Sequence, residues 1–221
     1  MQKLLATSLC VLFATILPSW SQLAIYSFTA TAGAGNSDEQ TGVGLTGTVT
    51  VTAGGTIQFD ITNLSGTGSF TSGDFVGFGF DDKFDNPIDT LVWGLSAAPA
   101  DWSLESDWTQ LWGNATRPYT GAIADNQGDA SGPGSGLDDG VSGTWVFDYT
   151  GDMQMVIDQW DSNSRPDMLA RFKTVGSPAN EGELSEKLEI NFVKVPEPST
   201  YGMIGAGALI LLATARRLKK K

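Results

Sequence analysis

The sequence predicts an all-β protein, an antiparallel β-sandwich of the jelly-roll or immunoglobulin kind. Three observations predict it. Apolar and polar residues alternate in many short runs, nearly every run ends at Gly, Asn, Asp or Ser, and no stretch shows the pattern of a long amphipathic helix. The order of the strands in the sheets does not follow from these patterns.

The clearest elements are two neighbouring runs, 43–52 and 56–63, in which the apolar residues line one face. Ala53-Gly54-Gly55 lies between them and predicts a turn, so the two runs are expected to form a hairpin. Further strands are predicted at 25–31, 75–80, 90–95, 144–149, 153–159, 169–173 and 187–193. The stretch 113–143 is rich in glycine and polar residues and is expected to be a loop.

Residues 1–21 have the layout of a secretory signal peptide. Lys3 precedes the apolar run 4–17, Pro18 ends that run, and the small residues near Ser21 predict cleavage after it, with Ala24 as a second site. The single cysteine of the chain, Cys10, lies within this segment. The mature protein is therefore expected to contain no disulfide. One β-sandwich domain is then expected over residues 22–194.

The C-terminal segment 195–221 combines three features. Pro196-Glu197-Pro198 comes first, an apolar run over 201–215 follows, and the basic tail 216–221 contributes Arg216, Arg217, Lys219, Lys220 and Lys221. As a helix the apolar run would be roughly 22 Å long, which is short against a hydrocarbon core of about 30 Å, but long basic side chains can extend it. We expect a single transmembrane helix, with the basic tail on the cytoplasmic side and the domain outside.

The two prolines hold the triplet extended, which is typical of a linker or of a peptide that a groove captures. The order Val195, Pro196, Glu197, Pro198, Ser199, Thr200, short Gly- and Leu-rich helix and basic terminus resembles the PEP-CTERM sorting signal of bacteria that secrete exopolysaccharide. This resemblance implies an exosortase substrate. Exosortases are membrane-embedded cysteine proteases or transpeptidases, and their catalytic residues would not belong to this chain.

The resemblance also implies a route. The chain would be exported, held for a time in the inner membrane of a Gram-negative-type bacterium, processed near Pro196–Pro198 and delivered to the cell surface or extracellular matrix. A weaker similarity links residues 56–81 to the β domains often found ahead of this signal, and it implies a sandwich without a known activity.

Charge and composition restrict the function of the domain. Without Lys3, the five basic tail residues and Glu197, the segment 22–194 keeps 24 acidic and seven basic residues, a net charge near −17. Binding to nucleic acid is not expected, because it requires positive charge against the phosphates. The chain contains no histidine, which removes the common nucleophilic triads and the usual catalytic zinc sites. We expect a protein that is not an enzyme.

Two acidic clusters are candidates for Ca²⁺ binding, since calcium prefers oxygen ligands. The first contains Asp81, Asp82 and Asp85, and the second contains Asp125, Asn126, Asp129, Asp138 and Asp139. Neither has EF-hand spacing. Acidic residues that simply face solvent in turns are the favoured interpretation, and no cofactor is expected.

The tryptophans offer a second candidate site. Trp102, Trp108 and Trp112 lie close together in the sequence and could form an exposed platform for sugars or could fill the core. Trp93, Trp145 and Trp160 are expected in the core. The sequence therefore predicts a non-enzymatic exported surface or matrix protein sorted through its C-terminal signal, with a carbohydrate-binding or adhesive module acting on exopolysaccharide as the alternative.

Overall fold

The computed structural model describes residues 22–33, 41–81, 92–108, 119–124, 136–162, 166–175 and 184–196. They form two antiparallel sheets, which confirms the expected all-β antiparallel fold. The first sheet contains β1 (Gln22–Thr31), β2 (Gly44–Thr52), β3 (Thr56–Asn63), β5 (Val92–Ala97), β8 (Ser142–Thr150) and β11 (Val193–Lys194). The second contains β4 (Asp74–Phe80), β6 (Trp102–Trp108), β7 (Tyr119–Ala124), β9 (Met168–Val175) and β10 (Leu184–Ile190). One short helix, α2 (Met153–Asp161), accompanies them.

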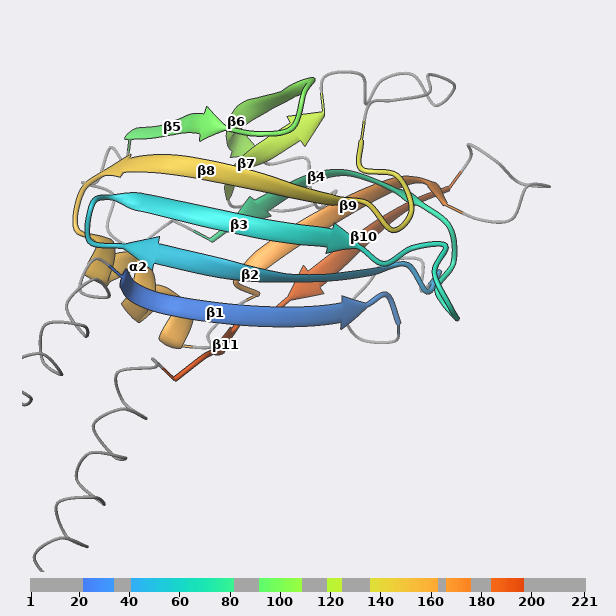
Figure 1. The fold of residues 1–221 in the computed structure, drawn as a ribbon, viewed down its shortest axis with the longest axis horizontal. Coiled ribbons are helices and arrows are strands. Elements are labelled where there is room, and N and C mark those ends of the chain that lie inside the picture. Colours follow the sequence, from blue (N-terminus) through green and yellow to red (C-terminus); the bar gives the residue numbers. More distant parts are fainter. Residues whose placement is uncertain are drawn as a thin grey trace, which may run out of the picture.

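The strand order is β11-β1-β2-β3-β8-β5 in the first sheet and β10-β9-β4-β7-β6 in the second. β3 pairs with β8 and β4 with β7, and then β5 adds to β8 and β6 adds to β7. The pairs therefore alternate between the two sheets as the chain proceeds. Figure 1 shows the first sheet in front, the strands of the second sheet crossing behind it, and α2 at one end.

The predicted hairpin of β2 and β3 is confirmed. Its turn residue Gly55 has φ 83°, a left-handed conformation that glycine adopts without steric cost. Along β2 the valines and Leu45 are buried, and Gly47 leaves room for the ring of Phe28, whose Cζ would lie 2.6 Å from a Cβ there. The turn chemistry and the alternation thus agree with the observed register.

The core between the sheets is aromatic. Phe59 of β3 is fully buried, and its ring lies 5.1 Å from those of Phe78 and Phe80 and 5.7 Å from that of Phe147. Ring pairs at these separations add to the stability that burial itself provides. The three tryptophans expected in the core are all buried there: Trp93, Trp145 and Trp160.

The strand predicted over 153–159 is wrong, because this segment is the helix α2. Its buried residues Met153, Val156, Ile157 and Trp160 follow the three- and four-residue spacing of a helix face. Asp152 caps the helix by accepting a hydrogen bond from the backbone N–H of Gln154. A nine-residue helix shows its spacing over only about two and a half turns, which is a weak signal next to many predicted strands.

Two strands, β6 and β7, were not predicted, and β7 lies inside the stretch 113–143 that was expected to be a loop. Every residue of β7 is buried, so the segment lacks the alternation by which half-buried strands are recognised. The other predicted strands exist with shifted ends. The run 187–193 divides into β10 and β11, which belong to different sheets.

The expected signal peptide 1–21 and membrane helix 201–215 lie outside the described residues. Within the part of the chain that the structure describes, no helix has the length and apolar character needed to cross a membrane.

Candidate functional site

The candidate site is the junction where the domain passes into the Pro-Glu-Pro segment. After β10 the chain crosses to the first sheet, and Phe192 enters the core with 7% of its surface exposed. β11 then pairs with the middle of β1, where Lys194 lies opposite Tyr26 and Val193 opposite Ser27. The backbone N–H of Val195 donates to the carbonyl of Ile25 at 2.8 Å.

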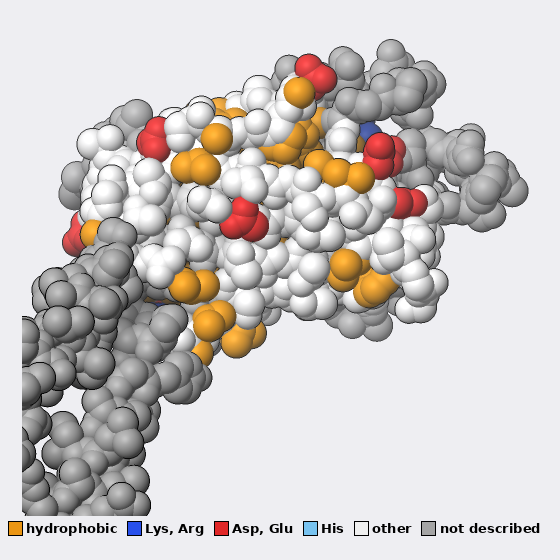
Figure 2. Space-filling view, in the orientation of Figure 1, with side chains coloured by type: hydrophobic (Ala, Val, Ile, Leu, Met, Phe, Trp, Pro, Cys, Tyr) orange, Lys and Arg blue, Asp and Glu red, His pale blue; other side chains and the backbone are white. Residues whose placement is uncertain are grey.

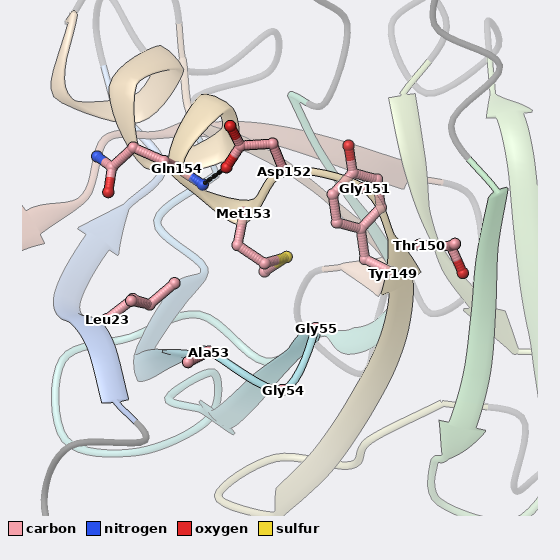
Figure 3. A pocket seen from close by; sticks show the side chains of 10 residues that line it. All are labelled: Leu23, Ala53, Gly54, Gly55, Tyr149, Thr150, Gly151, Asp152, Met153 and Gln154. Carbon is pink, nitrogen blue, oxygen red and sulfur yellow. Dashed lines mark hydrogen bonds between the residues drawn. The ribbon is translucent and has the colours of Figure 1, made fainter.

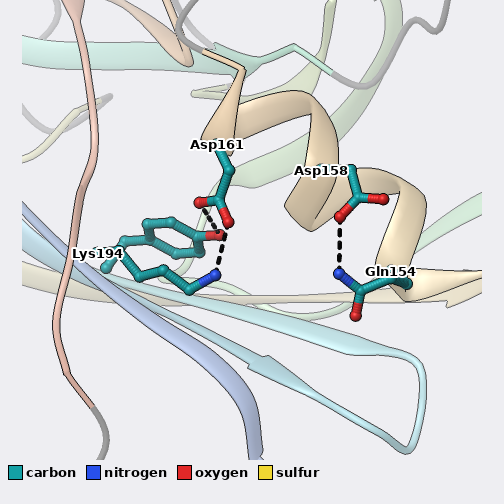
Figure 4. A network of polar contacts seen from close by, with 5 residues as sticks. Gln154, Asp158, Asp161 and Lys194 are labelled. Atoms are coloured by element: carbon teal, nitrogen blue, oxygen red, sulfur yellow. Dashed lines mark hydrogen bonds and ion pairs between the residues drawn. The ribbon is translucent and has the colours of Figure 1, made fainter.

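An ion pair holds this junction to α2. The Nζ of Lys194 lies 2.6 Å from Oδ2 of Asp161, as Figure 4 shows. The Tyr26 hydroxyl donates to the other oxygen of Asp161 at 3.0 Å, and Lys194 Nζ lies 5.8 Å from the centre of the Tyr26 ring. Burial, assisted by the hydrogen bond to Asp161, raises the pKa of Tyr26 above its ordinary value, so this phenol stays protonated.

A second carboxylate holds the backbone of the junction. The N–H of Phe192 donates to Oδ2 of Asp167 at 2.6 Å, and Asp167 is 3% exposed. Burial raises the pKa of Asp167 to about 7; the charge of Asp81 acts in the same direction, and the Phe192 hydrogen bond opposes it. The junction is thus fixed by one buried acid and one partly exposed acid.

Asp81 is not the solvated turn acid that the sequence favoured. Its side chain is buried and accepts from Nε2 of Gln159 at 3.1 Å, and its backbone N–H donates to the carbonyl of Asp167 at 2.9 Å. It therefore joins the helix α2 to the second sheet. Its predicted neighbours Asp82 and Asp85 lie outside the described residues, so a calcium site there stays a prediction.

The second acidic cluster is described in part. Asp139 accepts hydrogen bonds from the Ser72 hydroxyl and from the N–H of Gly73 at 3.0 Å, which ties two loops together. The carbonyl of Asp138 accepts from Val141 in a turn. Residues 125, 126 and 129 lie outside the described ranges. Among the residues that the structure describes, no group of three His, Cys, Asp or Glu side chains could hold a metal ion.

Of the predicted tryptophan platform, the structure describes the side chain of Trp102 alone. Trp102 is 9% exposed, and its ring lies 4.8 Å from that of Trp145 and 5.6 Å from that of Phe75. Its faces are therefore covered by the core, as the core interpretation expected. The backbone of Trp108 belongs to β6, whereas its side chain and the whole of Trp112 lie outside the described part.

A hollow of about 530 Å³ lies at the end of the sandwich near α2 (Figure 3). The turn Ala53–Gly55, Leu23, and the segment Tyr149–Gln154 line it. Asp152 is the one carboxylate among these residues, and it already accepts from Gln154 as the helix cap. The lining offers no pair of facing carboxylates, so it does not supply the groups of a glycosidase.

The comparisons with known proteins concern the same junction. A family profile described as the PEP-CTERM protein-sorting motif matches residues 194–220. The end of this chain is a PEP-CTERM sorting motif. Such a motif implies export and sorting at the membrane by an exosortase. Searches among curated proteins and among solved structures gave no significant match.

The structure places only the start of the PEP-CTERM motif. Val195 is half-buried against β1 and Pro196 is exposed, whereas 197–200 and the basic tail 216–221 lie outside the described residues. Tyr26, Asp161 and Asp167 hold the junction, and nothing in the sequence pattern predicts this role for them. They come from β1, the end of α2 and the segment before β9, and no local pattern connects them to the motif.

Proposed function

We propose that this protein is a non-enzymatic exported protein that an exosortase sorts through its C-terminal Pro-Glu-Pro signal to the cell surface or extracellular matrix. The observation that carries the proposal is the match of the sorting motif to residues 194–220, which begins at the last residue of β11, the final strand that the structure describes. The domain is the delivered part, and the motif with the predicted membrane helix is its address.

In this proposal the chain supplies the recognition peptide and the membrane anchor, and the exosortase supplies the catalysis. Residues 196–198 offer a stiff extended peptide, 201–215 stop the chain in the inner membrane, and the basic tail keeps the end on the cytoplasmic side. Bond cleavage or transfer is carried out by the catalytic groups of the exosortase. The absence of histidine from this chain agrees with a substrate that contributes recognition and no catalysis.

Replacing residues 196–198 by three alanines tests this function. The variant is expected to accumulate in the inner membrane with its basic tail intact, as seen by fractionation and by mass spectrometry of both ends of the chain. Replacing Ser177 and Pro178 by alanine, which removes one proline outside the motif, is the control and should leave sorting unchanged. Normal release of the 196–198 variant would contradict the proposal.

The outward face of the first sheet favours a second function, binding of a neutral polysaccharide. In a domain with a net charge near −17, the outward residues of β2, β3 and β8 include only two charges, Asp60 and Asp148. The rest are mostly hydroxyl side chains, and Figure 2 shows this face as largely uncharged. An uncharged sugar polymer suits such a face better than an ionic partner. Covering the face with a neutral polymer buries few charged groups, so binding incurs little desolvation cost.

The hydroxyls lie in rows across the strands. Thr29, Thr46, Thr62 and Ser142 are successive partners in register, and hydroxyl oxygens are 2.9 Å apart in the first pair and 2.7 Å apart in the last. Each hydroxyl can both donate and accept, so the row retains capacity for the hydroxyls of a sugar chain.

Affinity electrophoresis in gels containing the exopolysaccharide tests this second function. The protein should be retarded, and Thr48→Lys in the middle of the face should abolish retardation. Ser103→Lys, exposed on β6 of the other sheet, is the matched control. Equal migration in gels with and without the polysaccharide would eliminate the second function.

A further inference from the structure

The sorting motif and the folded domain overlap. The match to the sorting-motif family begins at Lys194, while the contacts of the domain continue to Val195. Lys194 and Val195 therefore belong to both. Lys194 is a residue of β11 and of the ion pair with Asp161, and Val195 has its backbone N–H bonded to Ile25.

The overlap matters because a peptide-processing enzyme commonly binds its substrate as an extended strand through main-chain N–H and C=O groups. The N–H of Val195 is engaged by β1 as long as β11 stays in place. The side chain of Lys194 is likewise directed to Asp161. Binding of this end of the motif by the enzyme and docking on β1 exclude each other.

The segment 192–195, which lies against β1, is held firmly at Phe192 and weakly beyond it. Phe192 is anchored, since its ring is buried among Tyr26, Phe28 and Trp160 and its N–H is bonded to Asp167. Beyond it, Val193 is 66% exposed, and the Lys194 and Asp161 side chains are 48% and 38% exposed. Detaching a two-residue edge strand with an exposed ion pair costs little free energy. Removing the buried Phe192 ring from the core would cost far more.

Detachment also changes the reach of the motif. Five residues, 196–200, separate Val195 from the start of the predicted membrane helix, and fully extended they span at most roughly 17 Å. Freeing 193–195 adds roughly 10 Å. A docked β11 therefore holds a folded domain close above the bilayer, where it leaves little room for a membrane enzyme around the peptide.

We propose that β11 is a clasp that must leave β1 before the sorting enzyme can take up the motif, and that Asp161 is a positioning residue that sets how often the clasp is open. This inference rests on the proposed sorting function. A tighter clasp should slow processing and a weaker clasp should speed it, in proportion to the population of the open form.

A disulfide between β1 and β11 tests the clasp directly. Ser27 and Val193 are opposite partners, and opposite Cα atoms in antiparallel strands lie within the range that a disulfide bridges. The variant Ser27→Cys/Val193→Cys has no competing thiol after export, since Cys10 lies in the predicted signal peptide. Processing is followed by pulse-chase in cells that contain the exosortase, with and without added reductant.

The oxidised double variant should be processed about tenfold more slowly than the same protein after reduction. Ser27→Cys alone should not respond to the reductant. The opposite change, Asp161→Asn, removes the charge that holds Lys194 and should speed processing about two- to fivefold. Asp158→Asn is its matched control, because Asp158 lies on the same helix and its carboxylate accepts a hydrogen bond from Gln154, whereas that of Asp161 binds Lys194 and Tyr26 (Figure 4).

Equal processing of the oxidised and reduced double variant would overturn the clasp. So would an Asp161→Asn rate equal to that of Asp158→Asn. These outcomes differ from failure of the sorting function, which is decided by the alanine variant of 196–198. If that variant is trapped while the oxidised double variant is processed at the reduced rate, the motif works without a clasp. If it is processed like wild type, both proposals fail.

Discussion

Replacing Asn63 by alanine should destabilise the domain more than its small volume suggests. Asn63 ends β3 and is fully buried. Its Nδ2 donates to the carbonyls of Gly73 at 2.8 Å and Leu137 at 2.9 Å, and its Oδ1 accepts from the N–H of Ser65 at 3.0 Å. One side chain thereby fixes the loop between β3 and β4 to the segment that leads into β8.

The size of the effect follows from which groups lose their partner. The carbonyl of Leu137 also accepts from the N–H of Phe75 at 3.0 Å and stays satisfied. The carbonyl of Gly73 and the N–H of Ser65 lose the bond that Asn63 gives them. A buried backbone group without a partner costs about 1–3 kcal/mol, so two such groups predict a loss of about 3 kcal/mol in the free energy of unfolding.

The measurement is urea unfolding followed by tryptophan fluorescence, with the slope m compared between variants. Asn191→Ala, at an exposed position, is the matched control and should change the free energy of unfolding by less than about 0.5 kcal/mol. A loss below about 1 kcal/mol for Asn63→Ala, at unchanged m, would refute the reasoning, since the two backbone groups would then have found other partners.

Three further predictions concern stability. Burial raises the pKa of Asp167 from an ordinary 3.8 to about 7, so the folded protein holds this proton to higher pH than the unfolded chain does. The contribution of protonated Asp167 to stability is therefore complete below pH 3.8 and is lost as the pH rises to about 7. Asp167→Asn should remove this part of the pH dependence of Tm, and parallel profiles of the variant and the wild type would contradict it. Asp152→Ala removes the cap that accepts from Gln154 and should cost about 1 kcal/mol, whereas Asp158→Ala should cost less than about 0.5 kcal/mol in the same unfolding assay. Phe59→Ala should cost about 3–5 kcal/mol because its buried ring meets aromatic rings of both sheets, and a cost near that of an exposed substitution would show that the core relaxes around the gap.

The fold was predictable where local chemistry and burial agree. The hairpin of β2 and β3 has alternating apolar residues on both sides of a glycine turn, and the structure has the same pairing. Prediction failed for β7, which lies between β4 and β6 in the second sheet: all of its residues are buried, so it lacks the alternation of a half-buried strand. It also failed for α2, because Met153, Val156 and Ile157 show the spacing of a helix face over only nine residues, too short a stretch to separate from a strand.

Of the candidate site, the sorting motif could be predicted from the sequence, whereas the residues that hold the junction could not. The motif 195–200 is contiguous, so its chemistry can be read along the chain, and the family profile matches it. The residues that hold the junction could not be found in this way. Tyr26 and Asp161 are 135 positions apart, and Phe192 and Asp167 are 25 positions apart. No residue type or spacing marks such pairs before the sheets close.

The sequence by itself therefore determined the class of the fold and the address of the protein, because alternation, turns and a contiguous sorting motif are local properties of the chain. Only the tertiary structure decided that Lys194 and Val195 are shared between that address and the domain. This sharing arises because β11 joins the edge of β1, a long-range contact made possible by the buried Phe192 and by carboxylates brought from α2 and from the segment before β9.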